Sequence, residues 1–159
     1  QRLSSTNGTS WSFVSGGTST NLYGVFWDGS QYIAGGDAGR LETSPDGTTW
    51  TSRTSNLTTA LGSFVPNGSL ILAGGSQEYA TSTDGVTWTR RTGAAGGDLW
   101  DGTRFVSYGG GSISSSTDGI NWTNTLNPYK PRSGPVAYNG SIYVAATNNS
   151  NTGGIWVFE

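Results

Sequence analysis

Acidic side chains are the groups in this chain with the widest scope for chemistry. The 159 residues include ten Asp or Glu, but no His and no Cys. Thiolate or imidazole metal sites, Ser–His or Cys nucleophile pairs and disulfide bonds are therefore excluded, and no cofactor is expected. The acidic residues remain as candidates for general acid–base catalysis, and their spacing in the sequence indicates whether that role or a structural one is favoured.

Three of the acidic residues recur inside one seven-residue phrase, Ser-x-Asp-Gly-x-x-Trp, and a fourth copy has Asn in place of Asp. The Asx positions 7, 46, 84 and 118 lie 39, 38 and 34 residues apart, which indicates repeated supersecondary units. A catalytic acid would not be expected four times at one spacing, so a structural role is favoured. The repeat residues are Asn7 and Trp11, Asp46 and Trp50, Asp84 and Trp88, and Asp118 and Trp122.

Each phrase predicts the tip of a β-hairpin. Asx-Gly between two strand-like runs favours a type I′ turn, because both residues tolerate positive φ. The Asx side chain is expected to accept hydrogen bonds from the amides of its own turn. The Trp four residues later is expected to pack back over the hairpin, so that all four indoles are largely buried.

The phrase resembles the Asp-box of sialidase-like β-propellers, also known as the BNR repeat, usually written Ser-x-Asp-x-Gly-x-Thr-Trp. The copies at residues 5–11, 44–50, 82–88 and 116–122 are closest to the shortened Ser-x-Asp-Gly-x-x-Trp form of bacterial and phage surface propellers. The resemblance implies a β-propeller. It implies little about activity, because in that family the box lies in a turn remote from the active site.

Length and composition limit which folds and which kinds of partner are possible. The chain is one domain's worth, residues 1–159, with 33% apolar and 11% charged residues, which suits short strands and many turns. A net charge of −2 gives no electrostatic footprint for nucleic acid, and no apolar run is long enough to insert into a membrane. Because Gln1 comes first and Met is absent, we expect a processed chain or a piece of a longer polypeptide.

A second set of Asx-Gly turns alternates with the first. Two hairpins per repeat give four strands, A to D, as in a propeller blade. The phrases join C to D and the second set joins A to B. This second set comprises Asp28-Gly29, Asn67-Gly68, Asp101-Gly102 and Asn139-Gly140.

The fold class expected is therefore all-β, a propeller of four-stranded antiparallel blades. Four A, four B and four D strands can be assigned, but five segments resemble C, including 2–5 and 154–158. We expect about four blades, closed between the N- and C-terminal strands. A five-bladed ring, with strands supplied by another chain or lost from the sequence, is the alternative.

The A–B and C–D turns of such a ring share one face, and the longer B–C and D–A loops share the other, which is the expected binding face. Its most distinctive loop contains Tyr129, Lys130 and Arg132 together with Pro128 and Pro131, which limit its flexibility, and offers a stacking ring beside two hydrogen-bond donors. A rigid surface connection is the alternative interpretation. The other ligand-binding candidates on this face are Asp37, Arg40, Glu78 and Asp98.

Two classes of function remain. The first is a non-catalytic, lectin-like module, carbohydrate-binding or protein-binding or structural, in an extracellular, cell-surface or virion-surface assembly. A homo-oligomer or a larger assembly would suit that role. The second is a sialidase-like glycoside hydrolase or a degenerate relative of one, which needs a pair of carboxylates or a Tyr–Glu pair with an arginine cluster. No arginine cluster matches that pattern and no catalytic residue can be assigned, so the sequence favours a protein that is not an enzyme.

Overall fold

The structure is a computed structural model that describes residues 2–14, 19–75, 78–93, 97–109, 112–126, 135–147 and 154–158. Within these ranges the chain is all-β, with one short 3-10 turn, η1 (Asp37–Gly39). All strand pairs are antiparallel and join neighbours in the sequence, so the chain is a succession of meandering sheets. The expected all-β class is confirmed.

Three sheets contain the expected four strands. They are β3 (Leu22–Trp27), β4 (Tyr32–Gly36), β5 (Arg40–Ser44) and β6 (Thr51–Thr54); β7 (Ser63–Pro66), β8 (Ile71–Gly74), β9 (Glu78–Ser82) and β10 (Thr89–Thr92); and β11 (Leu99–Trp100), β12 (Phe105–Gly109), β13 (Ser112–Ser116) and β14 (Thr123–Leu126). In each sheet the phrase connects the third strand to the fourth.

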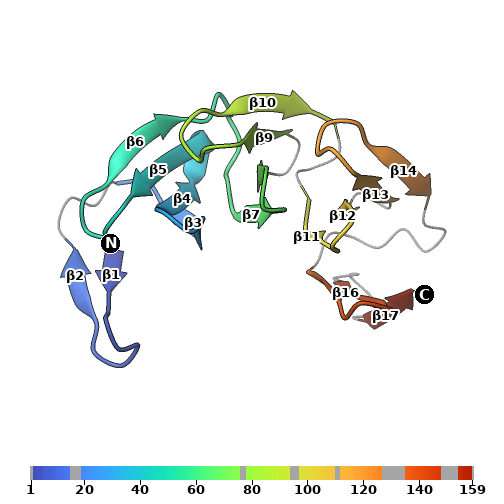
Figure 1. The fold of residues 1–159 in the computed structure, drawn as a ribbon, viewed down its shortest axis with the longest axis horizontal. Helices are drawn as coiled ribbons and strands as arrows, with labels where there is room; N and C mark the ends of the chain where they lie inside the picture. The colour runs from blue at the N-terminus through green and yellow to red at the C-terminus, as the bar shows by residue number, and fades with distance from the viewer. Residues whose placement is uncertain are drawn as a thin grey trace.

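Two incomplete sheets lie at the ends. The N-terminal sheet has two strands, β1 (Arg2–Ser4) and β2 (Ser12–Val14), which flank the first copy of the phrase. The C-terminal sheet has three strands, β15 (Val136–Tyr138), β16 (Tyr143–Thr147) and β17 (Gly154–Phe158). Figure 1 shows the five sheets following one another along an open arc, with the two incomplete sheets at its opposite ends.

The predicted closure between the N- and C-terminal strands is wrong for this structure. The first strand, β1, pairs only with β2, and β17 pairs with β16 through a five-residue register from Tyr143↔Phe158 to Thr147↔Gly154. Each terminal segment therefore has a ladder partner close by in the sequence. A local partner costs less loop-closure entropy than a pairing between the two ends of the chain.

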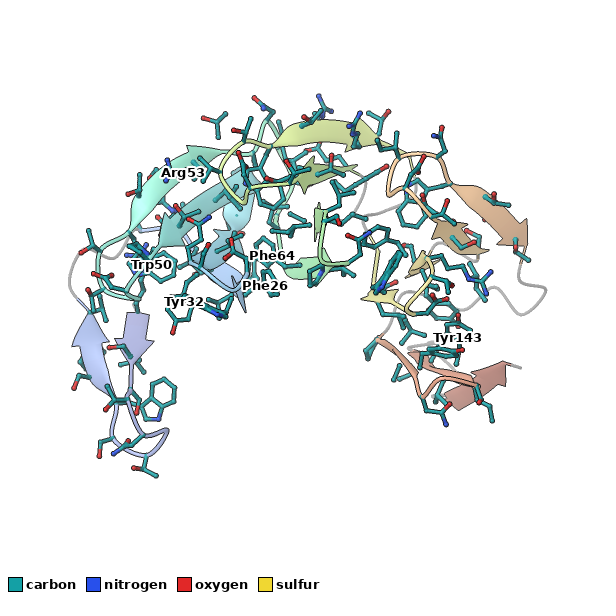
Figure 2. The ribbon with its side chains drawn as sticks, viewed as in Figure 1. Phe26, Tyr32, Trp50, Arg53, Phe64 and Tyr143 are labelled. Carbon is teal, nitrogen blue, oxygen red and sulfur yellow. The ribbon has the colours of Figure 1, made fainter. Side chains whose placement is uncertain are left out.

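The core lies between successive sheets rather than inside any one of them. Ile33 and Leu41 of the β3–β6 sheet share a cluster with Ile71 and Trp88 of the β7–β10 sheet. The rings of Phe26 and Phe64 stack across that interface at 6.4 Å, and Figure 2 shows them pointing toward one another. The opposite face of the β7–β10 sheet contributes to a second cluster, made by Val65, Leu72, Tyr79 and Phe105.

The Asx-Gly turns form at the predicted positions, but the type I′ prediction is wrong. Positive φ occurs at the glycine, for example 72° at Gly47 and 69° at Gly85, whereas Asp46 and Asp84 do not have it. The Asx carboxylate instead accepts two amide hydrogen bonds beyond the glycine, from Thr48 and Thr49 in the case of Asp46. This Asx-turn bonding replaces the tight two-residue geometry. The same bonds are present at Asn7, Asp84 and Asp118, as expected.

The expected burial of the four indoles holds only in part. Trp88 is 4% exposed and Trp50 and Trp122 are half-buried, but Trp11 is 59% exposed. The prediction is therefore wrong for Trp11. Its hairpin, β1–β2, is the first sheet of the arc and has no sheet before it to cover the indole.

Candidate binding site

A hollow of about 460 Å³ lies at the ends of β5 and β6, on the side where the longer loops emerge. Strands β5 and β6 contribute to it, together with η1, the segment that follows β6, and Thr20 from the segment before β3. Most of its lining residues are polar or charged, but Ala38, Leu41 and Leu57 give its wall a substantial apolar part. The lining residues are Thr20, Asp37, Ala38, Gly39, Arg40, Leu41, Ser52, Arg53, Thr54, Ser55, Asn56 and Leu57.

The backbone of this hollow contains the two non-glycine residues with positive φ among those described. They are Ala38 at 53° and Asn56 at 61°. A left-handed alanine costs about 1–2 kcal/mol, so the surrounding contacts must hold it in place. Gly39 follows with φ 70°, and a Cβ there would lie 2.1 Å from the Leu57 carbonyl oxygen. The two loops therefore pack backbone against backbone, which favours a rigid wall.

Hydrogen bonds fix the loop that follows β6. Ser55 Oγ donates to the Gly39 carbonyl at 2.5 Å, and the Leu57 amide donates to Ser55 Oγ at 3.1 Å. Asn56 Nδ2 donates to the carbonyl of Trp88 at 3.2 Å, which ties the loop to the next sheet. The hollow is thus shaped before any ligand arrives.

Arginine side chains dominate the charge around the hollow. The buried carboxylate of Glu42 is paired with both Arg40 and Arg2, and Arg40 Nε donates to it at 2.7 Å. Arg53 Nε donates to Thr43 Oγ1 at 2.9 Å, and Arg53 makes no ion pair among the described residues. A charge without an acidic partner is available to a ligand that carries carboxylate or hydroxyl groups.

Asp37 is the one acidic residue in the wall of the hollow. The hydroxyl of Tyr23 donates to its carboxylate at 2.6 Å, and Asn21 Nδ2 donates at 3.0 Å. These bonds, the Tyr23 hydroxyl first, lower the pKa of Asp37 from its ordinary value. The same hydrogen bond raises the pKa of Tyr23. Asp37 is therefore held as an anion that braces the loop.

The predicted binding residues do not all come together. Asp37 and Arg40 both line the hollow. Glu78 has a structural role instead, because it accepts the amides of Thr58 and Thr59 and pairs with Arg90 at 2.7 Å. These bonds, the Thr58 amide first, lower the pKa of Glu78 to about 2.

Asp98 also lies away from the hollow, where it accepts a hydrogen bond from the Tyr108 amide. The loop with Tyr129, Lys130 and Arg132 lies outside the described residues.

Sequence reasoning missed Arg53 and Asn56. A signal for Arg53 was present, since Arg91 occupies the same place in the next sheet and donates in the same way to Thr81 at 3.2 Å. Aligning the fourth strands of the repeats would have found that pair. Asn56 gives no such signal, because its importance lies in a backbone angle.

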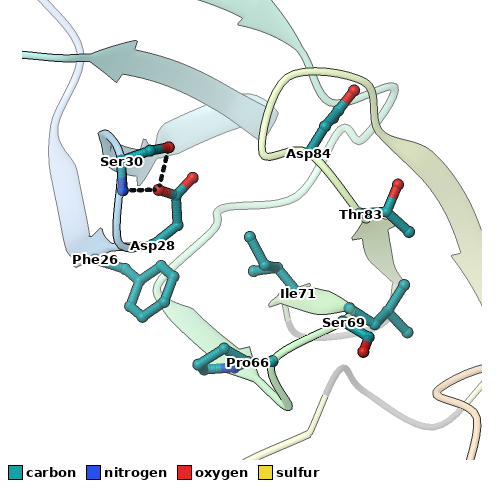
Figure 3. A pocket seen from close by; sticks show the side chains of 10 residues that line it. Phe26, Asp28, Ser30, Pro66, Ser69, Ile71, Thr83 and Asp84 are labelled. Carbon is teal, nitrogen blue, oxygen red and sulfur yellow. Dashed lines mark hydrogen bonds between the residues drawn. The ribbon is translucent and has the colours of Figure 1, made fainter.

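The face with the Asx-Gly turns carries a smaller hollow of about 210 Å³ (Figure 3). Phe26, Pro66 and Ile71 lie on its apolar side, and Asp28 and Asp84 lie above them. Both carboxylates are already occupied. Asp28 accepts the Ser30 and Gln31 amides, and Asp84 accepts those of Val86 and Thr87. This hollow could enclose part of a ligand, but its two carboxylates already accept backbone hydrogen bonds.

A third cavity, of about 300 Å³, separates the β11–β14 sheet from β15 and β16. It is more apolar than the other two and lies between sheets rather than among loops. Its lining residues are Arg104, Val106, Tyr108, Ile113, Ser115, Thr125, Val136 and Tyr143.

Among the described residues, no group of three or more Asp or Glu could hold a metal ion, and no helix is long and apolar enough to span a membrane. The chain matches no protein-family model, and a comparison with curated proteins finds no match.

Proposed function

We propose that the chain is a non-catalytic binding module with β-propeller architecture, belonging to a secreted, cell-surface or virion-surface assembly. The fold proposal is supported by three four-stranded sheets that pack face to face along an arc, with one Asx-Gly phrase per sheet. The Asp-box resemblance points in the same direction. The partner is a glycan or a protein.

The observation that carries the binding proposal is the rigid, donor-rich hollow beside Arg40 and Arg53. Two guanidinium groups, those of Arg40 and Arg53, and one carboxylate, that of Asp37, line it. The net formal charge of these three side chains is +1. A ligand with hydroxyl groups and a carboxylate would complete both the hydrogen bonding and the charge.

The test is a glycan array followed by calorimetric titration of any ligand found. Arg53→Gln should weaken binding at least about tenfold, equivalent to about 1.4 kcal/mol. Arg91→Gln is the matched control, because it removes the same arginine–threonine bond in the next sheet, away from the hollow. Both variants should melt at similar temperatures.

Equal weakening by the two variants would contradict the assignment of the site. Turnover of a fluorogenic glycoside by the unmodified chain would contradict the non-catalytic proposal and favour a hydrolase.

A further inference from the structure

The phrase turns and the second set of Asx-Gly turns differ at the N–H group of the glycine. In all four phrases this N–H donates a hydrogen bond to Oγ of the Ser that opens the phrase. The donor–acceptor distances are 2.8–2.9 Å, from Gly8 to Ser5, Gly47 to Ser44, Gly85 to Ser82 and Gly119 to Ser116. The phrase Ser therefore engages the glycine amide in every copy.

The second set of turns has no such acceptor. The residue two positions before the Asx, where the phrase has Ser, is apolar in all four turns, namely Phe26, Val65, Leu99 and Ala137. The N–H groups of Gly29, Gly68, Gly102 and Gly140 donate to no residue that the structure describes. All four glycines are exposed, and an added Cβ would meet nothing within 4 Å at any of them. These amides are open to solvent.

The side-chain oxygen of the Asx is held in the same way in both sets. At Asn67 it accepts the amides two and three residues on at 2.9 and 2.8 Å, and at Asn139 at 3.0 and 2.9 Å. Two N–H donors on one carbonyl oxygen stabilise the negative charge that develops there when a nucleophile adds to the carbonyl carbon. Both turns therefore polarise the side-chain amide of their Asn.

Three of the turns contain Asn-Gly, at Asn7, Asn67 and Asn139. We propose that Asn67 and Asn139 are sites of spontaneous deamidation, and that Ser5 protects Asn7 from the same reaction. At Asn67 the Gly68 nitrogen loses its proton to solvent and attacks Cγ. The side-chain nitrogen takes up a proton and leaves as ammonia, so that a five-membered succinimide forms. Glycine has no Cβ to obstruct this approach.

Water completes the reaction by opening the succinimide at either carbonyl. Opening at the side-chain carbonyl gives Asp, and opening at the main-chain carbonyl gives isoaspartate, with one more methylene in the main chain. In both cases an amide and a water become a carboxylate and ammonia. The Asp product keeps the turn, because Asp28 and Asp101 fill the equivalent positions with the same two amide bonds.

Asn7 shows that exposure alone does not separate the three sites. Asn7 and Gly8 are both exposed, and Asn7 Oδ1 also accepts two amides at 2.9 Å. The Gly8 N–H, however, is bonded to Ser5 Oγ. The nitrogen must lose this proton to become a nucleophile, and a hydrogen-bonded amide is protected from proton loss for as long as the bond stays closed. The hydroxyl of the phrase Ser thus slows the first step.

Peptide mass spectrometry of the folded, unmodified chain after incubation at mildly alkaline pH measures the three rates together. Asn67 and Asn139 should deamidate at least about tenfold faster than Asn7, equivalent to about 1.4 kcal/mol in activation free energy. In denaturant the three rates should become similar, because each Asn then precedes an unbonded glycine amide. Equal rates in the folded chain, or a difference that persists in denaturant, would overturn the proposal.

A matched pair of variants tests the two turn types within one sheet. Asp28→Asn places an Asn before the unbonded amide of Gly29, and Asp46→Asn places one before Gly47, whose amide donates to Ser44 Oγ at 2.8 Å. Both turns belong to the β3–β6 sheet, so opening of that sheet affects both. Deamidation should be at least about tenfold faster in Asp28→Asn. Equal rates would overturn the role of the glycine amide.

The hydroxyl itself is tested at the first phrase. Ser5→Ala should raise the deamidation rate of Asn7 toward that of Asn67, whereas Ser5→Thr keeps an acceptor and should leave the rate low. Acceleration in both variants, or in neither, would overturn the protective role of Ser5. None of these measurements involves the hollow beside Arg53, so this proposal and the proposed function can fail separately.

Discussion

The phrases around Trp88 and Trp11 have the same turn in two different surroundings. In both, the Asx oxygen accepts two amides at 2.7–2.9 Å and the indole N–H donates to the glycine carbonyl, at 3.0 Å for Trp88 and 3.2 Å for Trp11. Yet Trp88 is 4% exposed and Trp11 is 59% exposed. Local hydrogen bonding therefore makes the turn, whereas the neighbouring sheet decides the burial of the indole.

This difference predicts the largest effect of substitution. Trp88→Ala should lower the free energy of unfolding by about 3–5 kcal/mol, because it empties a core position between two sheets. Trp11→Ala should cost about 0.5 kcal/mol or less, as an exposed substitution does. Denaturant unfolding of the two variants and the unmodified chain measures both values. Equal losses would show that the turn itself, and not the neighbouring sheet, determines the contribution of the indole.

The glycines of the same two phrases sharpen the comparison. Gly85 and Gly8 have φ of 69° and 75°, so an alanine at either position should cost about 1–2 kcal/mol in backbone strain. A Cβ at Gly85 would also lie 2.7 Å from Ile33 Cδ1 and 2.9 Å from Asp28 Oδ2, whereas nothing lies within 4 Å at Gly8. Gly85→Ala should therefore lower the melting temperature clearly more than Gly8→Ala. Similar shifts would mean that Ile33 and Asp28 can move away from the added methyl group with little loss of stability.

The smallest expected effect concerns acid. The amides of Thr87 and Val86 hold the pKa of Asp84 at about 2, below its ordinary value of 3.8. A lowered folded-state pKa contributes stability that is present above 3.8 and is lost as the pH falls toward 2. Asp84→Asn should keep the turn, as Asn7 does naturally, and make the stability less sensitive to acid in that window. Thermal melting between neutral pH and pH 2 measures this.

An unchanged acid profile in Asp84→Asn would show that other carboxylates account for the acid sensitivity. Asp46, Asp101 and Asp118 also have lowered pKa values, so Asp84→Asn should remove only part of the acid sensitivity of the stability.

The strands could be predicted from the sequence because two sets of Asx-Gly turns, each with its own hydrogen-bonding partners, divide the chain at regular intervals. The exposure of Trp11 could not be predicted, because the four phrases are alike in sequence and do not indicate which of them lacks a neighbouring sheet. The open arc was missed for the same reason: local patterns say which strands pair within a repeat but not how the ends meet.

The candidate site was predicted less well than the fold. Asp37 and Arg40 were named as candidates because charged residues in the longer loops are few, and both line the hollow. Arg53 lines it too but was not named, because it lies on a polar strand. The left-handed angles of Ala38 and Asn56 carry no sequence signature, since glycine is the residue that usually marks such positions.

The β7–β10 sheet contributes to both core clusters, with Ile71 and Ala73 on one side and Val65 and Leu72 on the other. In a linear array whose units contact mainly their neighbours, the unit with two stabilised interfaces opens last and the ends fray first. Amide exchange should then be slowest in β8 and β9 and fastest in β1 and β2. The chain would behave less like one all-or-none unit than like a short row of coupled units, whose cooperativity depends on its central member.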